Sequence, residues 1–390
     1  MDTQLREQAK QSVRERVASL GEVALDLSHR IHAHPELAFE EHSASAALAG
    51  VLDQHGFTVT RGVADLPTAL VGSAGGGELV VGLCAEYDAL PEIGHACGHN
   101  VITAAAALAG MALAPSADSL GLTVKVFGTP AEERGGGKII MLGRGVFDGV
   151  HAALMVHPTP HDMVRPTIAA HCGLDVEFFG ETPPAMAPEQ GRNAGAAATL
   201  LEVAVGLLRQ SIRSTDRLAG YVRSAGTASN VMPKYAALSF SLRSATDERL
   251  AELIGQVRRC AEGAALATGT DVEIREHTRY GALRHHAGMG EYYRTNAERL
   301  GRVFPPVGAQ DAERSASTDF GDVSARIPAI HPLVGIDAQG ASNHQAAFTA
   351  YCAGPEGDRA VLDAGTALAL TIVDIATDPD LRDELMAARP

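Results

Sequence analysis

Apolar side chains recur at helical spacing over residues 3–33, and Pro35 ends the pattern, so we predict a long first helix there. A second helix is expected over residues 43–55, where Gly56 supplies its end. The alanine-rich run over residues 101–114 has the apolarity of a buried helix. Between these helices, short apolar segments predict strands at residues 57–60, 68–72 and 78–84.

The alternation of strands and helices continues up to residue 156. We expect a strand over residues 122–127, a glycine-rich turn at 135–137 that leads into a short helix, and another strand over residues 152–156. Strands that alternate with helices are typical of a mostly parallel, doubly wound sheet. We therefore predict an α/β fold for this part of the chain.

The pattern changes near residue 170, where the order becomes strand, helix, strand, strand, helix, strand. This order is typical of a ferredoxin-like α+β domain. Its strands are expected at residues 173–180, 218–224, 235–242 and 272–277, and its helices at residues 193–211 and 247–267. We predict that residues 169–280 form a domain inserted into the main domain, which comprises residues 1–168 and 281–390.

Composition narrows the class of protein. A chain of 390 residues suggests two domains, and 46% hydrophobic with 20% charged residues is ordinary for a soluble protein. The net charge of −15 argues against a nucleic acid or an anionic membrane as partner. We find no signal-peptide core and no apolar run of the ~18 residues that a membrane span needs. Five scattered cysteines do not indicate a disulfide framework, so we expect a cytoplasmic location.

Candidate chemistry begins with Cys97 and His99, which lie between the strand at 78–84 and the helix at 101–114. Open α/β sheets bind ligands at such crossovers, and cysteine and histidine are ligands of zinc, manganese or cobalt. A Cys-x-His pair alone is a weak signal. Its weight depends on whether further ligands lie at the ends of neighbouring strands.

Three further segments supply such ligands, each at the end of a predicted strand: Glu132 with Glu133, then His157, then His344. Together with Cys97 and His99 they form a set of sulfur, nitrogen and oxygen donors large enough for two metals. Each residue also has an ordinary interpretation, because glutamate pairs are usually solvated and a histidine at a strand end is usually a hydrogen-bonded core residue. Spacing alone leaves both interpretations open.

The chain resembles the di-metal aminoacylase/carboxypeptidase family of metallopeptidases. Its motifs are similar to the branch of hippurate hydrolases, auxin-conjugate hydrolases, aminobenzoyl-glutamate hydrolases and the dipeptidase that acts on β-alanyl-lysine, and they span nearly the whole chain. The matching segments, in order, are residues 32–41, 86–100, 129–133, 230–233, 317–324 and 342–344. The resemblance implies a catalytic domain of the zinc-peptidase type with a phosphorylase/hydrolase-like sheet, and an inserted lid at residues 169–280.

The resemblance also implies a role for each site residue. Two divalent ions, with zinc or manganese favoured and cobalt allowed by ligand type, are expected on Cys97, which bridges them, and on His99, Glu133, His157 and His344. Glu132 is expected to be the general base that takes a proton from activated water and returns it to the leaving amine. Asp88 is expected to stabilise the site by orienting the metal ligands rather than by binding metal itself. A small amide or amino-acid conjugate is the expected substrate.

The predicted lid departs from the family pattern. Pro184 stands where a Gly-x-x-His motif places histidine, and Ala219 stands where a second histidine commonly precedes Gly220. Neither side chain donates a hydrogen bond, so a substrate or oxyanion contact is lost or supplied elsewhere. Asn230 and Arg243 remain as candidates for binding a substrate carboxylate.

Two hypotheses follow. The first is a metal-dependent amidohydrolase or peptidase that cleaves an N-acyl, N-aroyl or dipeptide-like amide bond. The second is a diverged member that deaminates an aromatic amine by hydrolysis, or binds without catalysis. Retention of Glu132 and all five ligands favours an active enzyme. The resemblance also implies a homodimer through the lid.

Overall fold

The computed structural model describes residues 3–304 and 316–388, and these residues form two compact units. Unit 1 takes in residues 3–166, 284–304 and 318–388. Unit 2 is Thr167–Leu283 with a short piece ending at Ser317. The stretches 1–2, 305–315 and 389–390 of the predicted main domain lie outside the described residues. The roles of these units as catalytic domain and lid stay predictions.

A six-stranded mixed sheet forms the centre of unit 1, in the order β1-β2-β4-β3-β5-β11. β4, β3, β5 and β11 are parallel, whereas β2 runs antiparallel to both of its neighbours. A separate parallel pair joins β6 to β12. The strands are β1 (Thr58–Arg61), β2 (Leu70–Ala74), β3 (Leu79–Glu86), β4 (Leu122–Thr129), β5 (Ala152–Leu154), β6 (His157–Thr159), β11 (Ala329–Ile330) and β12 (Leu333–Gly335).

The mostly parallel sheet is confirmed, with two differences in detail. β2 pairs antiparallel, a direction that short apolar segments do not encode. The predicted strand at 152–156 ends at Leu154, and the chain then enters β6 at His157, because His157 pairs with Leu333 of β12 and not within the large sheet.

Helices cover the sheet in two layers. α3 (His99–Leu113) packs on β3 and β4, and every one of its residues is buried. Its small side chains allow close approach, since a Cβ added at Gly365 of α11 would lie 3.0 Å from the carbonyl oxygen of Ala105. The other helices of unit 1 are α1 (Thr3–Ala33), α2 (His42–Gln54), α4 (Gly137–Gly143), α7 (Ala287–Glu298), α9 (Phe320–Ser324), α10 (Ala346–Tyr351), α11 (Pro355–Thr377) and α12 (Pro379–Ala387).

Buried polar contacts tie three of these helices together. Lys10 of α1 forms an ion pair of 2.6 Å with Asp374 of α11, and Asn296 of α7 hydrogen bonds to both side chains. α11 is the one helix among the described residues that is long and apolar enough to cross a membrane, but 89% of its most apolar window is buried in the fold. It packs on α1, α3 and α7, so length and composition here describe a core helix.

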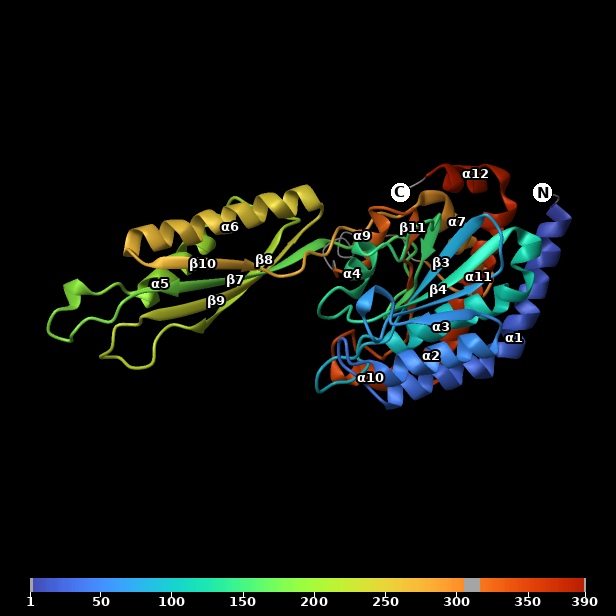
Figure 1. Ribbon diagram of the computed structural model, residues 1–390, viewed down its shortest axis with the longest axis horizontal. Coiled ribbons are helices and arrows are strands. Elements are labelled where there is room, and N and C mark those ends of the chain that lie inside the picture. Colours follow the sequence, from blue (N-terminus) through green and yellow to red (C-terminus); the bar gives the residue numbers. More distant parts are fainter. Residues whose placement is uncertain (1–2, 305–315, 389–390) are drawn as a thin grey trace. The chain divides into compact units, whose positions relative to one another are not determined.

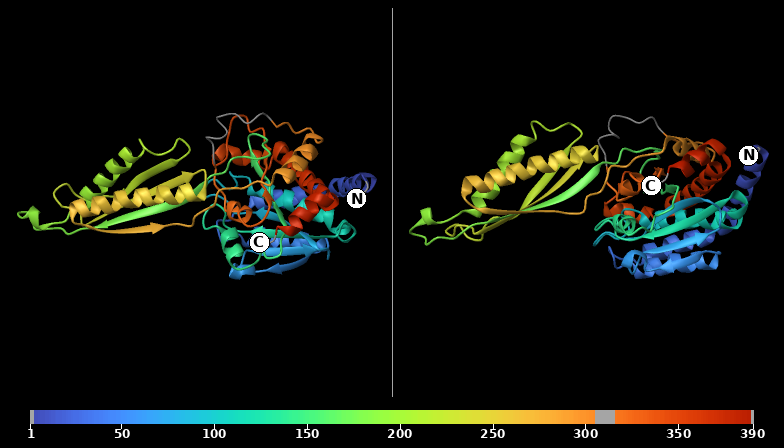
Figure 2. Two further views of the ribbon diagram at one scale, coloured as in Figure 1. Left: turned by 90° about the horizontal axis from the view of Figure 1, so that it is seen from above. Right: turned by 45° about the horizontal axis from the view of Figure 1, so that its top comes forward.

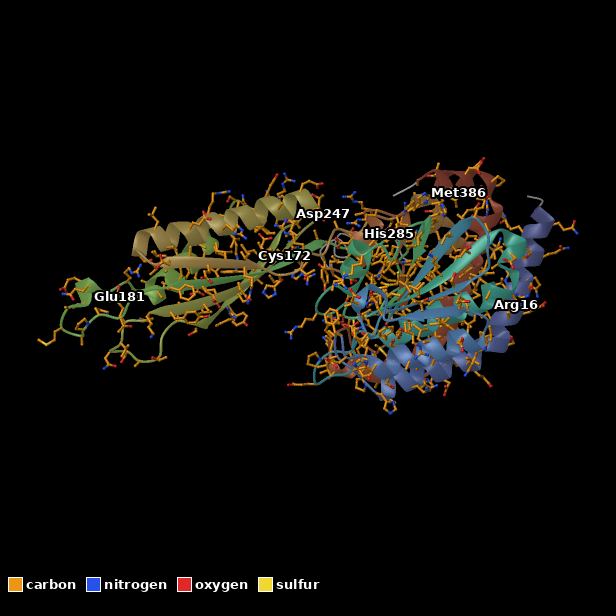
Figure 3. The ribbon with its side chains drawn as sticks, viewed as in Figure 1. Arg16, Cys172, Glu181, Asp247, His285 and Met386 are labelled. Carbon is orange, nitrogen blue, oxygen red and sulfur yellow. The ribbon has the colours of Figure 1, made fainter. Side chains whose placement is uncertain are left out.

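Unit 2 is an antiparallel sheet with two helices on one face (Figures 1 and 2). The strand order is β10-β7-β9-β8, and the order along the chain is the predicted β-α-β-β-α-β, so the ferredoxin-like topology is confirmed. Figure 3 places Cys172 on β7 and Asp247 where α6 begins. The elements are β7 (Ala170–Phe179), α5 (Ala194–Leu208), β8 (Arg217–Ser224), β9 (Tyr235–Ser244), α6 (Asp247–Thr268) and β10 (Asp271–Glu276).

Candidate metal centre

The predicted ligands of unit 1 gather at the carboxyl edge of the parallel strands. His99 is the first residue of α3, two residues earlier than the predicted helix start, so its side chain is carried by a rigid element. Glu132 and Glu133 lie in the loop after β4, and His157 begins β6 just after β5 ends. The carboxyl ends of parallel strands converge on one crevice in open α/β sheets, which explains why these residues lie close together.

Cys97 stands at the middle of the cluster. Its Sγ lies 3.4 Å from Nε2 of His157 and 3.3 Å from Nε2 of His344. The ligand atoms of Cys97, His99 and His157 lie within 4.8 Å of one another, and so do those of Cys97, Glu133 and His344. Two potential sites of three donors each therefore share one sulfur. This geometry brings together all five residues that the sequence proposes as ligands.

Asp88 orients two of the five. One of its oxygens lies 3.0 Å from Nδ1 of His99, and the other accepts a hydrogen bond of 2.9 Å from the backbone N–H of Glu133. Because a carboxylate accepts, Nδ1 of His99 carries a proton, and Nε2 is the ring nitrogen that can bind a cation once it is deprotonated. The charge of Asp88 also lowers the energy of a protonated His99, so the pKa of His99 lies well above its ordinary value although burial acts to lower it.

Nε2 of His99 and Oε1 of Glu133 are buried atoms of the centre without a hydrogen-bond partner among the described residues. They face each other at 3.8 Å. A buried polar atom without a partner costs about 1–3 kcal/mol, so native proteins rarely leave such atoms unpaired. Potential ligand atoms that converge in a buried space without partners are the expected arrangement for a cation, and thiolate, imidazole and carboxylate suit a transition metal. The residues fit the metals that the sequence predicts.

His157 is ready to bind a metal, whereas Cys97 must first lose a proton. Burial lowers the pKa of His157 to about 4, so its ring is neutral near pH 7. Its Nδ1 donates to the carbonyl of Pro158 at 2.9 Å, which leaves Nε2 as the free lone pair toward Cys97. Burial and the charge of Glu133 raise the pKa of the Cys97 thiol well above its usual range. Metal binding at Cys97 would therefore release a proton.

Glu132 has the environment of a proton acceptor that works near neutral pH. Its side chain is 9% exposed. Burial raises its pKa well above the ordinary value, and the charges of Glu86 and Glu133 raise it further. Such tuning brings a carboxylate closer to the pH at which general acid–base catalysis is efficient.

Backbone strain accompanies this placement. Ala131, directly before Glu132, has a φ of 59°, and its N–H donates to buried Glu41 at 2.8 Å. His344 has a φ of 66° and is tied to Ala96 by its own N–H. Next to it, Asn343 donates to the carbonyl oxygens of Cys97 and Pro158. Residues held in the left-handed region cost about 1–3 kcal/mol and cluster at functional sites.

Sequence reasoning missed four buried residues beside the centre. Glu86 ends β3, and Lys138 of α4 contacts both Glu86 and Asp319. His331 follows β11, has no partner for either ring nitrogen among the described residues, and lies 5.8 Å from the ring of His157. Glu86 and Asp319 lie inside the matching motifs, and this position could have indicated a role at the site. Lys138 and His331 lie outside those motifs, so nothing in the sequence pointed to them.

The proposed substrate residues belong to unit 2. Arg243 lies near the end of β9, and its guanidinium donates to Oγ of Ser317 at 2.7 Å. Asn230 is exposed in the turn before β9, and Ala219 lies on the edge strand β8. Pro184 lies in the loop between β7 and α5.

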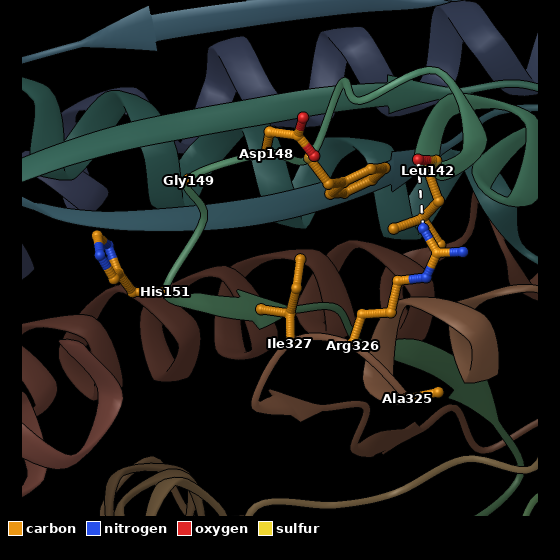
Figure 4. Close-up of a pocket in the computed structure, with 8 residues that line it drawn as sticks. Leu142, Asp148, Gly149, His151, Ala325, Arg326 and Ile327 are labelled. Atoms are coloured by element: carbon orange, nitrogen blue, oxygen red, sulfur yellow. Dashed lines mark hydrogen bonds between the residues drawn. The ribbon is translucent and has the colours of Figure 1, made fainter. Parts of the chain in front are cut away.

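A pocket elsewhere in unit 1 is distinct from this centre. It has a volume of about 930 Å³ and is lined by Asp148, His151, Arg326 and their neighbours (Figure 4). Gly149 and His151 lead into β5, and Ile327 leads into β11, so the pocket lies at the amino ends of these strands. Ligands of open α/β sheets bind at the opposite, carboxyl edge.

We predict that Gly98→Ala damages the metal centre. Gly98 lies between Cys97 and His99 with a φ of +83°, and a Cβ there would lie 2.4 Å from Cγ of Pro158. The variant is expected to lose about 1–3 kcal/mol of unfolding free energy and most of its bound metal, measured by denaturant unfolding and metal analysis. Gly50→Ala in α2, where a Cβ meets nothing within 4 Å, is the control and should gain about 0.5–1 kcal/mol. Full metal content in Gly98→Ala would show that this turn does not set the ligands.

Comparison with known proteins agrees with this centre. The family model described as peptidase family M20/M25/M40 matches residues 82–357. A mouse Xaa-Arg dipeptidase is 33% identical over 95% of this chain and 90% of its own length. One of the subunits of the p-aminobenzoyl-glutamate hydrolase of Escherichia coli K12 is 30% identical over 92% of this chain and 90% of its own length.

Solved structures share the fold. A dinuclear metal-binding peptidase of Bacillus subtilis superposes with a TM-score of 0.70 at 23% identity, covering 91% of this chain and 99% of its own. An aminobenzoyl-glutamate utilization protein of Klebsiella pneumoniae gives a TM-score of 0.69 at 21% identity, over 91% of this chain and 97% of its own. The family model matches residues 82–357, and the mouse dipeptidase is 33% identical over 95% of this chain. The chain therefore belongs to peptidase family M20/M25/M40.

Proposed function

We propose that this protein hydrolyses the amide bond of a small N-acyl, N-aroyl or dipeptide-like amino-acid conjugate, with two divalent metal ions at the Cys97 centre. One observation carries the proposal. Two groups of three potential ligands share Cys97, and buried Glu132 lies beside them with Oε2 4.0 Å from Nε2 of His99. Metal ligands with an adjacent carboxylate of raised pKa suit hydrolysis by activated water.

The chain's own residues have distinct tasks in this reaction. Divalent ions bound here would make water more acidic and polarise the scissile carbonyl. Glu132 accepts the proton of the attacking water and donates it to the leaving nitrogen. Asp88 keeps the lone pair of His99 and the backbone of Glu133 turned to the centre. The buried position of Glu132 excludes competing water from that carboxylate.

The names of the relatives support the substrate class. One relative is an Xaa-Arg dipeptidase and another a p-aminobenzoyl-glutamate hydrolase, so both act on an amide whose amine side is an amino acid. We propose the same class here, with Asn230 and Arg243 as the candidates for the substrate carboxylate. The donor set suits zinc, and manganese and cobalt are compatible with it. Five free cysteines support a reducing cytoplasm as the location.

We predict that Glu132→Gln keeps its metals and loses turnover. The amide preserves the shape of the side chain but accepts no proton, so kcat should fall by at least about 100-fold. Glu133→Gln, one residue on, is the matched control and should instead lower metal content, because Glu133 belongs to one of the two groups that share Cys97. Steady-state kinetics and metal analysis of both variants check the roles. An active Glu132→Gln enzyme would contradict the general-base assignment.

Product analysis separates amide hydrolysis from deamination. Hippurate, aminobenzoyl-glutamate, β-alanyl dipeptides, dipeptides ending in arginine and aromatic amines form the substrate panel. We expect an acid and a free amino acid in equal amounts from at least one amide, with no ammonia. Ammonia released without a cleaved acyl group would support deamination, which the absent lid histidines at Pro184 and Ala219 keep as the second candidate. If no compound is turned over, the result would support a protein that binds its ligand without catalysis.

We also propose that unit 2 forms a homodimer with a second copy. α5 carries an exposed apolar stripe of Leu200, Val203 and Leu207, whose exposed fractions are 41%, 55% and 60%. β8 is an edge strand of the sheet beside it, with unpaired backbone along one side among the described residues. Exposed apolar patches and open sheet edges are common association surfaces.

Sedimentation analysis tests this surface. The wild type should sediment at twice the mass of one chain, and the double variant Val203→Glu/Leu207→Glu should sediment as a monomer, because two charges would be buried in the interface. Leu266→Glu on α6, a site that is 86% exposed, is the control and should remain dimeric. A monomeric wild type at tens of micromolar would rule the dimer out.

A further inference from the structure

Glu86 at the end of β3 and Lys138 of α4 lie beside the metal centre, and neither has a role in the reaction described above. Both side chains are completely buried. Nζ of Lys138 lies 2.5 Å from Oε1 of Glu86 and 2.8 Å from Oδ1 of Asp319, and the backbone N–H of Lys138 donates to the other oxygen of Asp319 at 2.9 Å. One ammonium thus holds two carboxylates in fixed directions.

The second oxygen of Glu86 points the other way, into the centre. Oε2 of Glu86 has no hydrogen-bond partner among the described residues and lies 3.6 Å from Nε2 of His99. That nitrogen is the one through which His99 can bind a cation, because Nδ1 donates its proton to Asp88. Oε2 of Glu86 is therefore a buried carboxylate oxygen that carries the cost of an unmade hydrogen bond unless a ligand pairs with it.

A cation resolves this arrangement. Ligand atoms of Glu86, His99 and Glu132 lie within 4.8 Å of one another, which makes a third group of potential metal donors that shares His99 with the Cys97 set. Burial of a carboxylate costs several kcal/mol unless positive charge compensates it. The single charge of Lys138 is shared between Glu86 and Asp319, so it compensates only one of these two carboxylates, and Oε2 of Glu86 faces His99.

We propose that Glu86 is a further acidic residue of the metal centre on its sheet side, and that Lys138 is the positioning residue that turns one Glu86 oxygen toward the metals. Glu86 would increase the affinity for the ion that His99 binds, either as a direct ligand or by acting on the residues that bind that ion. Asp319, the other partner of Lys138, takes no part in ion binding. The inference rests on the proposed function for its metals, but it concerns ion affinity and not hydrolysis.

Zn²⁺ titration of the metal-free full chain against a chromophoric chelator tests the role of Glu86. The wild type should show two binding events, and Glu86→Gln, which keeps the shape of the side chain, should weaken one of them by about 10- to 100-fold. Asp319→Asn is the matched control, since it also removes a carboxylate from Lys138 but none from the third donor group. It should keep both affinities within about threefold. Wild-type Zn²⁺ affinity at both sites in folded Glu86→Gln would overturn the proposal, as would equal losses in both variants.

A double-mutant cycle tests the positioning role of Lys138. Lys138→Met should weaken the same Zn²⁺ event as Glu86→Gln and change the visible spectrum of the Co²⁺ protein in the same way. In the Glu86→Gln background, where less buried charge is left uncompensated, Lys138→Met should cause no further loss of affinity. Additive losses would show that Lys138 does not act through Glu86. These readouts need no substrate, so failure of the proposed hydrolysis leaves them unaffected.

Discussion

The hydrogen bond from Nδ1 of His99 to Asp88 constrains the whole centre. It keeps a proton on Nδ1, so Nε2 is the ring nitrogen that faces the cluster and can bind a metal. The second oxygen of Asp88 holds the backbone of Glu133, which links the start of α3 to the loop after β4. Around His99 the structure then places carboxylates and a cysteine with few donors among the described residues. Such a cluster is stable only with cations or protons inside it.

The fold explains how distant residues reach this cluster. Neighbouring parallel strands place their ends at one edge of the sheet. Glu86 ends β3, Glu132 and Glu133 follow β4, and His157 follows β5, so these side chains lie together at that edge. Gly98 gives the left-handed turn that carries the chain from Cys97 into α3. Buried contacts such as Lys10 with Asp374 hold the helices that support α3. The ligands are therefore mounted on the rigid core of unit 1 or tied to it by hydrogen bonds.

Much of this arrangement was predictable from sequence because it is local. Apolar periodicity located the first helix at residues 3–33 and the ferredoxin-like order of unit 2, and strand ends located the ligand candidates. Contacts between distant segments were not predictable. Lys138 and Asp319 are 181 positions apart, and nothing near either residue indicates the other. The break after Leu154 depends on pairing between β6 and β12, which a local apolar run cannot reveal. Substrate residues stay predictions for the same reason, since recognition depends on contacts that no motif in this chain encodes.

Metal analysis of protein purified without chelators tests the central claim most directly. Potential ligand atoms converge at Cys97, His99, Glu133, His157 and His344, and we attribute this to two divalent ions that bind among them. We expect close to two divalent ions per chain, lost on chelation and restored by adding zinc, manganese or cobalt. A folded protein with all five residues intact that binds no divalent ion under these conditions would contradict this assignment.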